Sequence, residues 1–237
     1  VDIISAINRG SVLVNYLGHG EYAGWGRWDE NERSIFDITD IGSLDNQGRL
    51  PVVIVGNCLN GFFTGPQSEI SAAEAFLRPK DSGAVAVWAS TGLGYASGHR
   101  VLMAEFYETI FHSAGHTLGA ATSAAKVEAY TQNSAWGELV QTFVLFGDPA
   151  TQLYYPYVES TIPADGTGNA PIDQEVQVIF SKPMSTTTVV LSVEGAPGVP
   201  FTPTWSAANT AVTYAHPDLY DGQTLTLTIE GQDEQGS

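Results

Sequence analysis

The chain has 237 residues, which suffice for one large domain or two small ones. It carries 9 Lys and Arg against 26 Asp and Glu, a formal net charge of −17 at pH 7. We therefore expect neither nucleic acid nor an anionic membrane surface as a partner, because both bind clustered cations. The sequence contains no run of about 18 apolar residues, so no membrane insertion is expected.

Two short apolar runs in the first quarter of the chain each lead into a reactive side chain. Residues 11–17 predict a strand that is followed by His19 and Gly20, and residues 51–56 predict a second buried strand that is followed by Cys58. In an open α/β sheet, ligands sit at the carboxyl ends of the strands. Two adjacent parallel strands would therefore deliver His19 and Cys58 to one crevice.

Cys58 is the one cysteine of the sequence, which excludes an intrachain disulfide. Its position after a buried strand and a glycine, opposite a His-Gly pair, favours a nucleophile over a structural cysteine. Asn57 and Glu74 are expected as hydrogen-bonding partners within the scaffold. Of the other histidines, His99 follows a glycine-rich loop and is a weaker candidate for substrate contact, and surface or core-edge positions are favoured for His112 and His116. A loop between His112 and His116 argues against a metal pair.

The segment between the two strands contains a loop and several carboxylates. Residues 21–28 are rich in glycine and tryptophan and predict a loop beside the crevice. Trp25 and Trp28 either line a substrate groove or pack this loop onto the core, and the sequence leaves both open. Three aspartates follow, without the spacing of an EF-hand, and surface carboxylates are favoured over a calcium site: Asp37, Asp40 and Asp45.

Further along, helical and strand patterns alternate. A third buried strand is predicted over residues 83–89, and the glycine-rich loop after it, with Thr91 and Tyr95, should border the same crevice. A fourth strand is expected over residues 143–146. Helices are predicted over residues 1–10, 68–77, 101–111 and 117–130. This alternation predicts an α/β domain with a mainly parallel sheet and helices on both faces.

The composition changes near Tyr157, where Thr, Val, Pro and Gly replace the helix formers. Strands at sandwich-like intervals are predicted over residues 176–180, 189–193, 211–214 and 225–229. We therefore divide the chain into an α/β domain, residues 1–156, and an all-β sandwich, residues 157–237. We expect the chain to be a piece of a longer polypeptide, with the last strand of the sandwich missing.

Four motifs carry a resemblance to a known family. They are Asn15-Tyr16-Leu17-Gly18-His19-Gly20, Gly56-Asn57-Cys58, Ser90-Thr91-Gly92-Leu93-Gly94 and Leu145-Phe146-Gly147-Asp148-Pro149. Together they resemble the gingipain (C25) family of caspase-like cysteine peptidases over residues 11–155. The tail resembles a bacterial Ig-like domain, through Pro171-Ile172-Asp173 and Phe180-Ser181-Lys182-Pro183-Met184.

The resemblance implies a secreted or cell-surface cysteine endopeptidase that acts on a protein or peptide. Cys58 would be the nucleophile and His19 the general acid/base, and the backbone N–H groups of Cys58 and Gly20 would bind the oxyanion. No cofactor is required, although a structural calcium ion fits the family. Family members carry the acidic residue that orients the histidine upstream of the His-Gly motif, so we expect the missing N-terminal part of the same polypeptide as a partner.

The alternative is a catalytically silent structural or adhesive surface protein that retains a peptidase-like scaffold. The acidity, the Ig-like tail and the absent upstream half favour it, whereas the intact His19 and Cys58 favour the peptidase. A thiol-based redox sensor is disfavoured, because the sequence holds no resolving cysteine.

Overall fold

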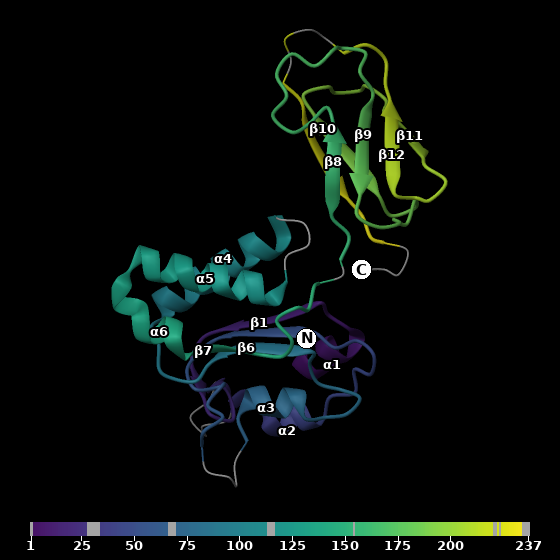
Figure 1. The fold of residues 1–237 in the computed structure, drawn as a ribbon. Coiled ribbons are helices and arrows are strands. Elements are labelled where there is room, and N and C mark those ends of the chain that lie inside the picture. The colour runs from purple at the N-terminus through teal and green to yellow at the C-terminus, as the bar shows by residue number, and fades with distance from the viewer. Residues whose placement is uncertain are drawn as a thin grey trace. The chain divides into compact units, whose positions relative to one another are not determined.

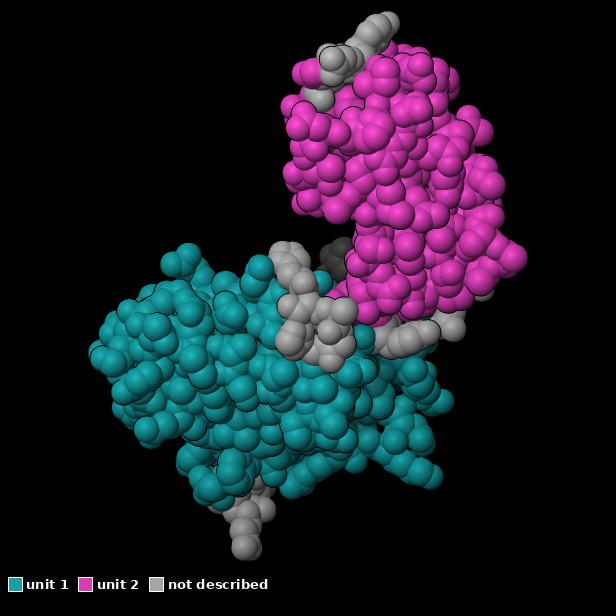
Figure 2. All heavy atoms as spheres, turned by 45° about the horizontal axis from the view of Figure 1, so that its top comes forward, with its two compact units in different colours: residues 1–153 teal, residues 154–237 magenta. Residues whose placement is uncertain are grey.

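A computed structural model describes residues 2–27, 34–65, 70–112, 117–153, 155–219, 222 and 224–233. The chain separates into two compact units, Val1–Leu153 and Tyr154–Ser237 (Figure 2). The structure thus divides the chain after Leu153, three residues before the division drawn from the change in composition. Among the described residues, no helix is both long and apolar enough to cross a membrane.

The first unit is built on a four-stranded sheet. Its order is β1 (Leu13–Leu17), β5 (Val52–Gly56), β6 (Ala86–Ser90) and β7 (Phe143–Phe146). β1, β5 and β6 run parallel, and β7 pairs antiparallel with β6. The expected mainly parallel sheet is confirmed, and the three parallel strands end at the same edge.

Helices cover both faces of this sheet (Figure 1). One face carries α1 (Ile3–Arg9), α2 (Ile38–Gly42) and α3 (Ala72–Leu77). The other carries α4 (Ala96–His112) and α5 (Leu118–Gln132), after which a short 3₁₀ turn (Ser134–Trp136) and α6 (Gly137–Thr142) lead into β7. The predicted two-sided cover is confirmed, and it explains why β5 and β6 are apolar without alternation. β1 lies at the edge of the sheet and is only partly buried, so its predicted burial is wrong.

The side chains of β5 pack into two separate hydrophobic cores, one on each face of the sheet. Val53 and Val55 point into the core beneath α1, α2 and α3, whereas Val52 and Ile54 point into the core that contains Trp88 and the α4 and α5 side chains. All four valine and isoleucine side chains are at most 1% exposed. Burial on this scale anchors the sheet, since each fully buried aliphatic side chain contributes about 1.5–3 kcal/mol.

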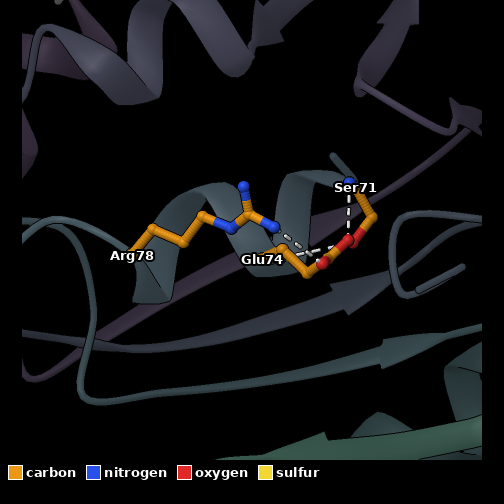
Figure 3. A network of polar contacts seen from close by, with 3 residues as sticks. All are labelled: Ser71, Glu74 and Arg78. Atoms are coloured by element: carbon orange, nitrogen blue, oxygen red, sulfur yellow. Dashed lines mark hydrogen bonds and ion pairs between the residues drawn. The ribbon is translucent and has the colours of Figure 1, made fainter. Parts of the chain in front are cut away.

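α3 begins later than predicted, and Figure 3 shows the reason. Ser71 is the N-cap: its hydroxyl accepts from the Glu74 N–H at 3.3 Å, and the Glu74 carboxylate accepts from the Ser71 N–H at 2.9 Å. This capping box starts the helix at Ala72, so residues 70 and 71 of the predicted helix precede it, and its residues 68 and 69 lie outside the described residues. Glu74 also pairs with Arg78 at 3.4 Å, an exposed contact that contributes little. The scaffold role expected for Glu74 is confirmed.

α4 begins earlier than predicted. The predicted helix starts at residue 101, after a glycine-rich loop that runs to Gly98, whereas α4 starts at Ala96 and includes Gly98 in its first turn. A Cβ on Gly98 would overlap Leu139, so the absent side chain allows α6 to pack closely against this turn. The predicted start of α5 is confirmed, since the Thr117 hydroxyl accepts from the Ala120 N–H at 3.2 Å.

The predicted loop over residues 21–28 is wrong in part. A small antiparallel sheet occupies this part of the chain, in the order β2 (Gly20–Glu21), β3 (Gly24–Arg27) and β4 (Ser34–Asp37). Gly24 permits the close pairing, because a Cβ there would come within 2.9 Å of the Phe36 carbonyl oxygen. Trp28 lies outside the described residues.

The second unit is a β-sandwich. One sheet has the order β11 (Thr202–Trp205), β12 (Ala211–Ala215), β9 (Val176–Phe180) and β8 (Val158–Ile162), and β10 (Val190–Glu194) pairs with β13 (Thr226–Glu230) in the other. Phe180, Val212 and Tyr214 are buried in its core. The alternating burial of β9 matches its predicted half-buried pattern.

Candidate active site

The turns that carry His19 and Cys58 lie side by side. β1 and β5 are paired in register up to Leu17 and Gly56, and the next N–H along β1, that of Gly18, donates to the Gly56 carbonyl at 3.2 Å. Both chains therefore leave the same edge of the sheet at adjacent points.

Gly20 and Asn57 bring the two turns into direct contact. A Cβ on Gly20 would lie 2.8 Å from the Asn57 Cβ and closer still to the Asn57 amide. Asn57 is fully buried, so it has no room to withdraw. The requirement for glycine at position 20 thus has a local cause: the His19 turn packs against the residue that precedes Cys58.

A pair of buried asparagines ties the Cys58 turn to the small sheet. The Asn57 amide donates to the Asn60 side-chain oxygen at 2.8 Å, and the Asn60 amide donates to the backbone carbonyls of Glu21 and Gly24, the latter at 2.9 Å. The scaffold role expected for Asn57 is confirmed. Asn60 was missed, because two asparagines three residues apart carry no recognisable pattern.

Cys58 is half-buried, and its thiol faces the loop that follows β6. The Sγ atom lies 3.8 Å from the Gly94 carbonyl oxygen. Leu59, the next residue, has a φ of 65°, which is rare for a residue with a Cβ. Its N–H donates to the Gly92 carbonyl at 3.1 Å. This unusual backbone turns the chain sharply after Cys58 and is held in place by the β6 loop; strained positions of this kind are frequent at active sites.

Three residues were expected to contact substrate, and they lie in different environments. Tyr95 is 73% exposed in the loop between β6 and α4. Thr91 is half-buried, and its N–H and hydroxyl both donate to the Thr142 carbonyl, at 2.8 and 3.0 Å. Trp25 is 3% exposed and belongs to the core with Phe36. A groove-lining role for Trp25 is therefore wrong, and its alternative, packing onto the core, holds.

His19 is exposed, and its backbone is firmly held. The His19 carbonyl accepts from the Tyr16 hydroxyl at 2.8 Å and from the Gly26 N–H at 2.7 Å. Tyr16 stacks on Trp25, with ring centroids 4.8 Å apart and planes within 2°. Neither contact of the carbonyl was foreseen, because both depend on tertiary structure.

His99 lies in the core of the first unit, not at a substrate groove. It is 2% exposed, its ring centroid is 5.5 Å from that of Phe143, and its Nε2 atom has no hydrogen-bond partner. Burial lowers the pKa of His99. A Cβ on Gly94 would overlap Nε2, so His99 supports the loop whose carbonyl faces Cys58. Substrate contact by His99 is excluded by this burial.

The three aspartates of the α2 region have structural partners. Asp37 and Asp40 form the capping box of α2, and Asp45 accepts from the Gln47 amide at 3.2 Å. Within the described part of the chain, no three His, Cys, Asp or Glu side chains are grouped to hold a metal ion. A structural calcium ion stays a prediction.

Comparison with known proteins accounts for both units. Residues 1–154 match the sequence profile of Peptidase family C25, and residues 154–237 match that of a bacterial Ig-like domain. Gingipain R2 and gingipain R1 of Porphyromonas gingivalis are each 32% identical over 164 residues. These alignments cover 63% of this chain but only 20% and 15% of the two relatives. The chain therefore spans a fifth or less of their length.

Two solved structures share the fold. One is the crystal structure of the Arg-specific cysteine proteinase gingipain R (RgpB), with 24% identity and a TM-score of 0.55. The other is the complex of the Porphyromonas gingivalis RgpB pro- and mature domains, with 23% identity and a TM-score of 0.58. Each match covers 97% of this chain and about half of the other chain, 52% and 53%. They confirm the caspase-like α/β fold followed by an Ig-like sandwich. Because the family profile spans residues 1–154, the chain belongs to peptidase family C25.

Proposed function

We propose that this chain carries the nucleophile and the general acid/base of a cysteine endopeptidase, with Cys58 and His19 in these roles. The observation that carries the proposal is the contact between the two turns: His19 and Cys58 follow paired strand ends, and Gly20 packs against Asn57. Membership of a peptidase family supports the same reaction class.

In the first half of the reaction, the Cys58 thiol passes its proton to His19, and its sulfur attacks the carbonyl carbon of the scissile peptide bond. An S–C bond forms, and the π electron pair moves to oxygen, where the N–H groups of Gly20 and Cys58 hydrogen-bond the oxyanion. When the tetrahedral intermediate collapses, the C–N bond breaks and His19 protonates the leaving amine. A thioester on Cys58 remains. Each oxyanion donor lowers such a barrier by about 3 kcal/mol.

In the second half, His19 takes a proton from water while the water oxygen attacks the thioester. The C–S bond breaks, the carboxylic acid product leaves, and the Cys58 sulfur recovers the proton. The imidazole is needed because an ordinary thiol, with a pKa of about 8.5, is only a few per cent thiolate at pH 7.

The substrate is proposed to be a protein or peptide that lies along the loop after β6. Tyr95 is open to solvent there, and Thr91 stands at the start of the same loop. An N-terminal part of the same polypeptide is proposed to complete the site, because this chain covers about half of the related solved chains. The attached Ig-like domain supports a secreted or cell-surface location.

Hydrolysis by single-site variants of the full-length protein tests the proposal. Cys58→Ala and His19→Ala should each abolish peptide hydrolysis, with the thermal unfolding profile unchanged. The matched control is His216→Ala, which removes a histidine from the Ig-like unit, between β12 and β13, and should leave hydrolysis intact. Undiminished hydrolysis by Cys58→Ala would refute the proposal.

The alternative function is a structural or adhesive protein on a silent peptidase scaffold. The Ig-like sandwich is the observation that favours it. It requires a wild-type protein that cleaves no member of a broad peptide library, and a Cys58 whose alkylation rate does not change in His19→Ala.

A further inference from the structure

The carbonyl of His19 is bound by two donors at once. The Tyr16 hydroxyl lies 2.8 Å from this oxygen and the Gly26 N–H lies 2.7 Å from it. Tyr16 comes from β1, three residues before His19, and Gly26 comes from β3. The peptide group that joins His19 to Gly20 is thus held by two separate elements.

The orientation of this peptide follows from the pairing of β2 with β3. Gly20 is opposite Trp25 in the ladder, and the Gly26 N–H donates a hydrogen bond to the carbonyl of His19, the residue before Gly20. In an antiparallel ladder this makes Gly20 and Trp25 a non-hydrogen-bonded pair, so the Gly20 N–H points away from β3. Because the peptide is planar and trans, holding the His19 carbonyl toward β3 and Tyr16 fixes the Gly20 N–H in the opposite direction.

The opposite direction is the open side of the small sheet. β2 is an edge strand, in the order β2-β3-β4, so this N–H is not used by the sheet ladder. Gly20 also packs against Asn57, which directly precedes Cys58. This N–H therefore belongs to a residue that lies against the Cys58 turn.

The ring and the hydroxyl of Tyr16 are held in place by neighbouring residues. Its ring stacks on the buried Trp25, and its hydroxyl occupies a space bounded by Gly18 and Gly26. A Cβ on Gly18 would come within 2.5 Å of the hydroxyl oxygen, and one on Gly26 within 2.6 Å. Burial raises the pKa of Tyr16, so the hydroxyl keeps its proton and stays a donor throughout the neutral range.

We propose that Tyr16 is the positioning residue of the oxyanion site: its hydroxyl fixes the His19–Gly20 peptide so that the Gly20 N–H is presented beside Cys58. The inference rests on the proposed peptidase function. It goes beyond that function because it assigns the orientation of an oxyanion donor to a side chain that takes no part in the proposed bond-breaking steps. Without this hydroxyl, the Gly26 N–H alone holds the carbonyl, and the peptide plane can rotate.

Two reagents that act on the same thiol separate orientation of the oxyanion donor from reactivity of the sulfur. Iodoacetamide alkylates Cys58 by displacement of iodide, and no oxyanion forms. The second reagent is a peptide aldehyde with the sequence that is cleaved best in a peptide library. The Cys58 sulfur adds to its carbonyl carbon, which places negative charge on the aldehyde oxygen. Aldehyde binding therefore needs the oxyanion donors, whereas alkylation does not.

For Tyr16→Phe in the active protein, kcat should fall about tenfold to a hundredfold with KM within about twofold. Aldehyde affinity should fall by a similar factor, and the alkylation rate should stay within about twofold of wild type. Gly18→Ala provides a second route, because its Cβ displaces the same hydroxyl, and should give the same selective loss. The matched control is Tyr214→Phe, a buried tyrosine of the Ig-like unit, which should change none of these values.

Two results would overturn the inference. Equal losses in alkylation and aldehyde affinity would mean that Tyr16 only supports the fold, and wild-type values in both variants would mean that the hydroxyl positions nothing. Failure of the proposed function itself looks different: the wild-type protein would then neither hydrolyse peptides nor bind the aldehyde, which refutes both claims before any variant is made.

Discussion

Replacing Gly20 with alanine tests the contact between the turns of His19 and Cys58. The new Cβ would lie 2.8 Å from the Asn57 Cβ, whereas ordinary van der Waals contact begins at 3.4 Å. The two turns must therefore separate by at least 0.6 Å at this point. Asn57 is fully buried and bonded to Asn60 at 2.8 Å, so the separation strains a packed core and a buried hydrogen bond.

The cost of this separation has two parts. Overpacking of this kind costs about 1–3 kcal/mol, and a buried hydrogen bond left unmade costs about 1–3 kcal/mol. With partial relaxation we expect Gly20→Ala to lose about 2–4 kcal/mol, which lowers the Tm of a unit of this size by about 4–16 °C. Because the same displacement moves a proposed oxyanion donor, kcat should fall about a hundredfold.

The assay combines calorimetry of the full chain with peptide hydrolysis at a temperature well below the lowered Tm. Gly42→Ala is the matched control, since nothing lies within 4 Å of its added Cβ and the residue ends α2. It should be neutral or stabilising by up to about 1 kcal/mol, as alanine is the better helix former. A Gly20→Ala protein that unfolds and hydrolyses like Gly42→Ala would refute the reasoning.

Three further predictions concern other parts of the chain. Burial lowers the pKa of His99 below its unfolded value of about 6.5. The unfolded state therefore gains the proton first, and the stability of the folded state falls as the pH drops below that value. In urea unfolding, His99→Met should lose less stability than wild type between pH 7.5 and pH 5. Asp233→Ala takes a carboxylate from the Lys182 ammonium, both at most 5% exposed, and should cost the Ig-like unit about 3–5 kcal/mol by calorimetry. Tyr95→Ala removes an exposed ring beside the proposed site and should raise KM several-fold without changing Tm.

Each of these predictions has a result that contradicts it. An equal pH dependence in wild type and His99→Met would place the acid sensitivity elsewhere. If Lys182→Met combined with Asp233→Ala is no more stable than Asp233→Ala alone, the ion pair does not explain the loss. An unchanged KM in Tyr95→Ala, with substrates of several lengths, would remove this residue from the substrate path.

The sequence alone predicts the parts of the fold that depend on local pattern. The strands that precede His19 and Cys58 lie next to each other as expected, and each leads into a glycine, Gly18 directly after β1 and Gly56 at the end of β5. The same holds for the cap at Thr117 and the alternation in β9. These features can be predicted because they depend on a few consecutive residues. This is true of burial on both faces of a sheet and of capping at the start of a helix.

Other features depend on contacts that a local pattern does not contain. Trp25 could not be assigned to core or groove, because an aromatic residue suits both, and only its burial in the core with Phe36 decides. The start of α4 was missed because glycine lowers helix propensity, whereas packing of Gly98 against Leu139 outweighs that cost. The Asn57–Asn60 pair and the Tyr16 hydroxyl are tertiary hydrogen bonds, and the sequence leaves no trace of them.

The central claim is that Cys58 forms a covalent acyl intermediate with its substrate. The most direct measurement mixes the full-length protein with a rapidly cleaved peptide ester, stops the reaction in acid within milliseconds to seconds, and weighs the intact protein and its fragments by mass spectrometry. The account predicts a mass gain equal to the acyl group of the ester, located on the fragment that contains Cys58, absent from Cys58→Ala and formed more slowly in His19→Ala. Hydrolysis by the wild-type protein with no acyl group on Cys58, or with the acyl group on another residue, would contradict it.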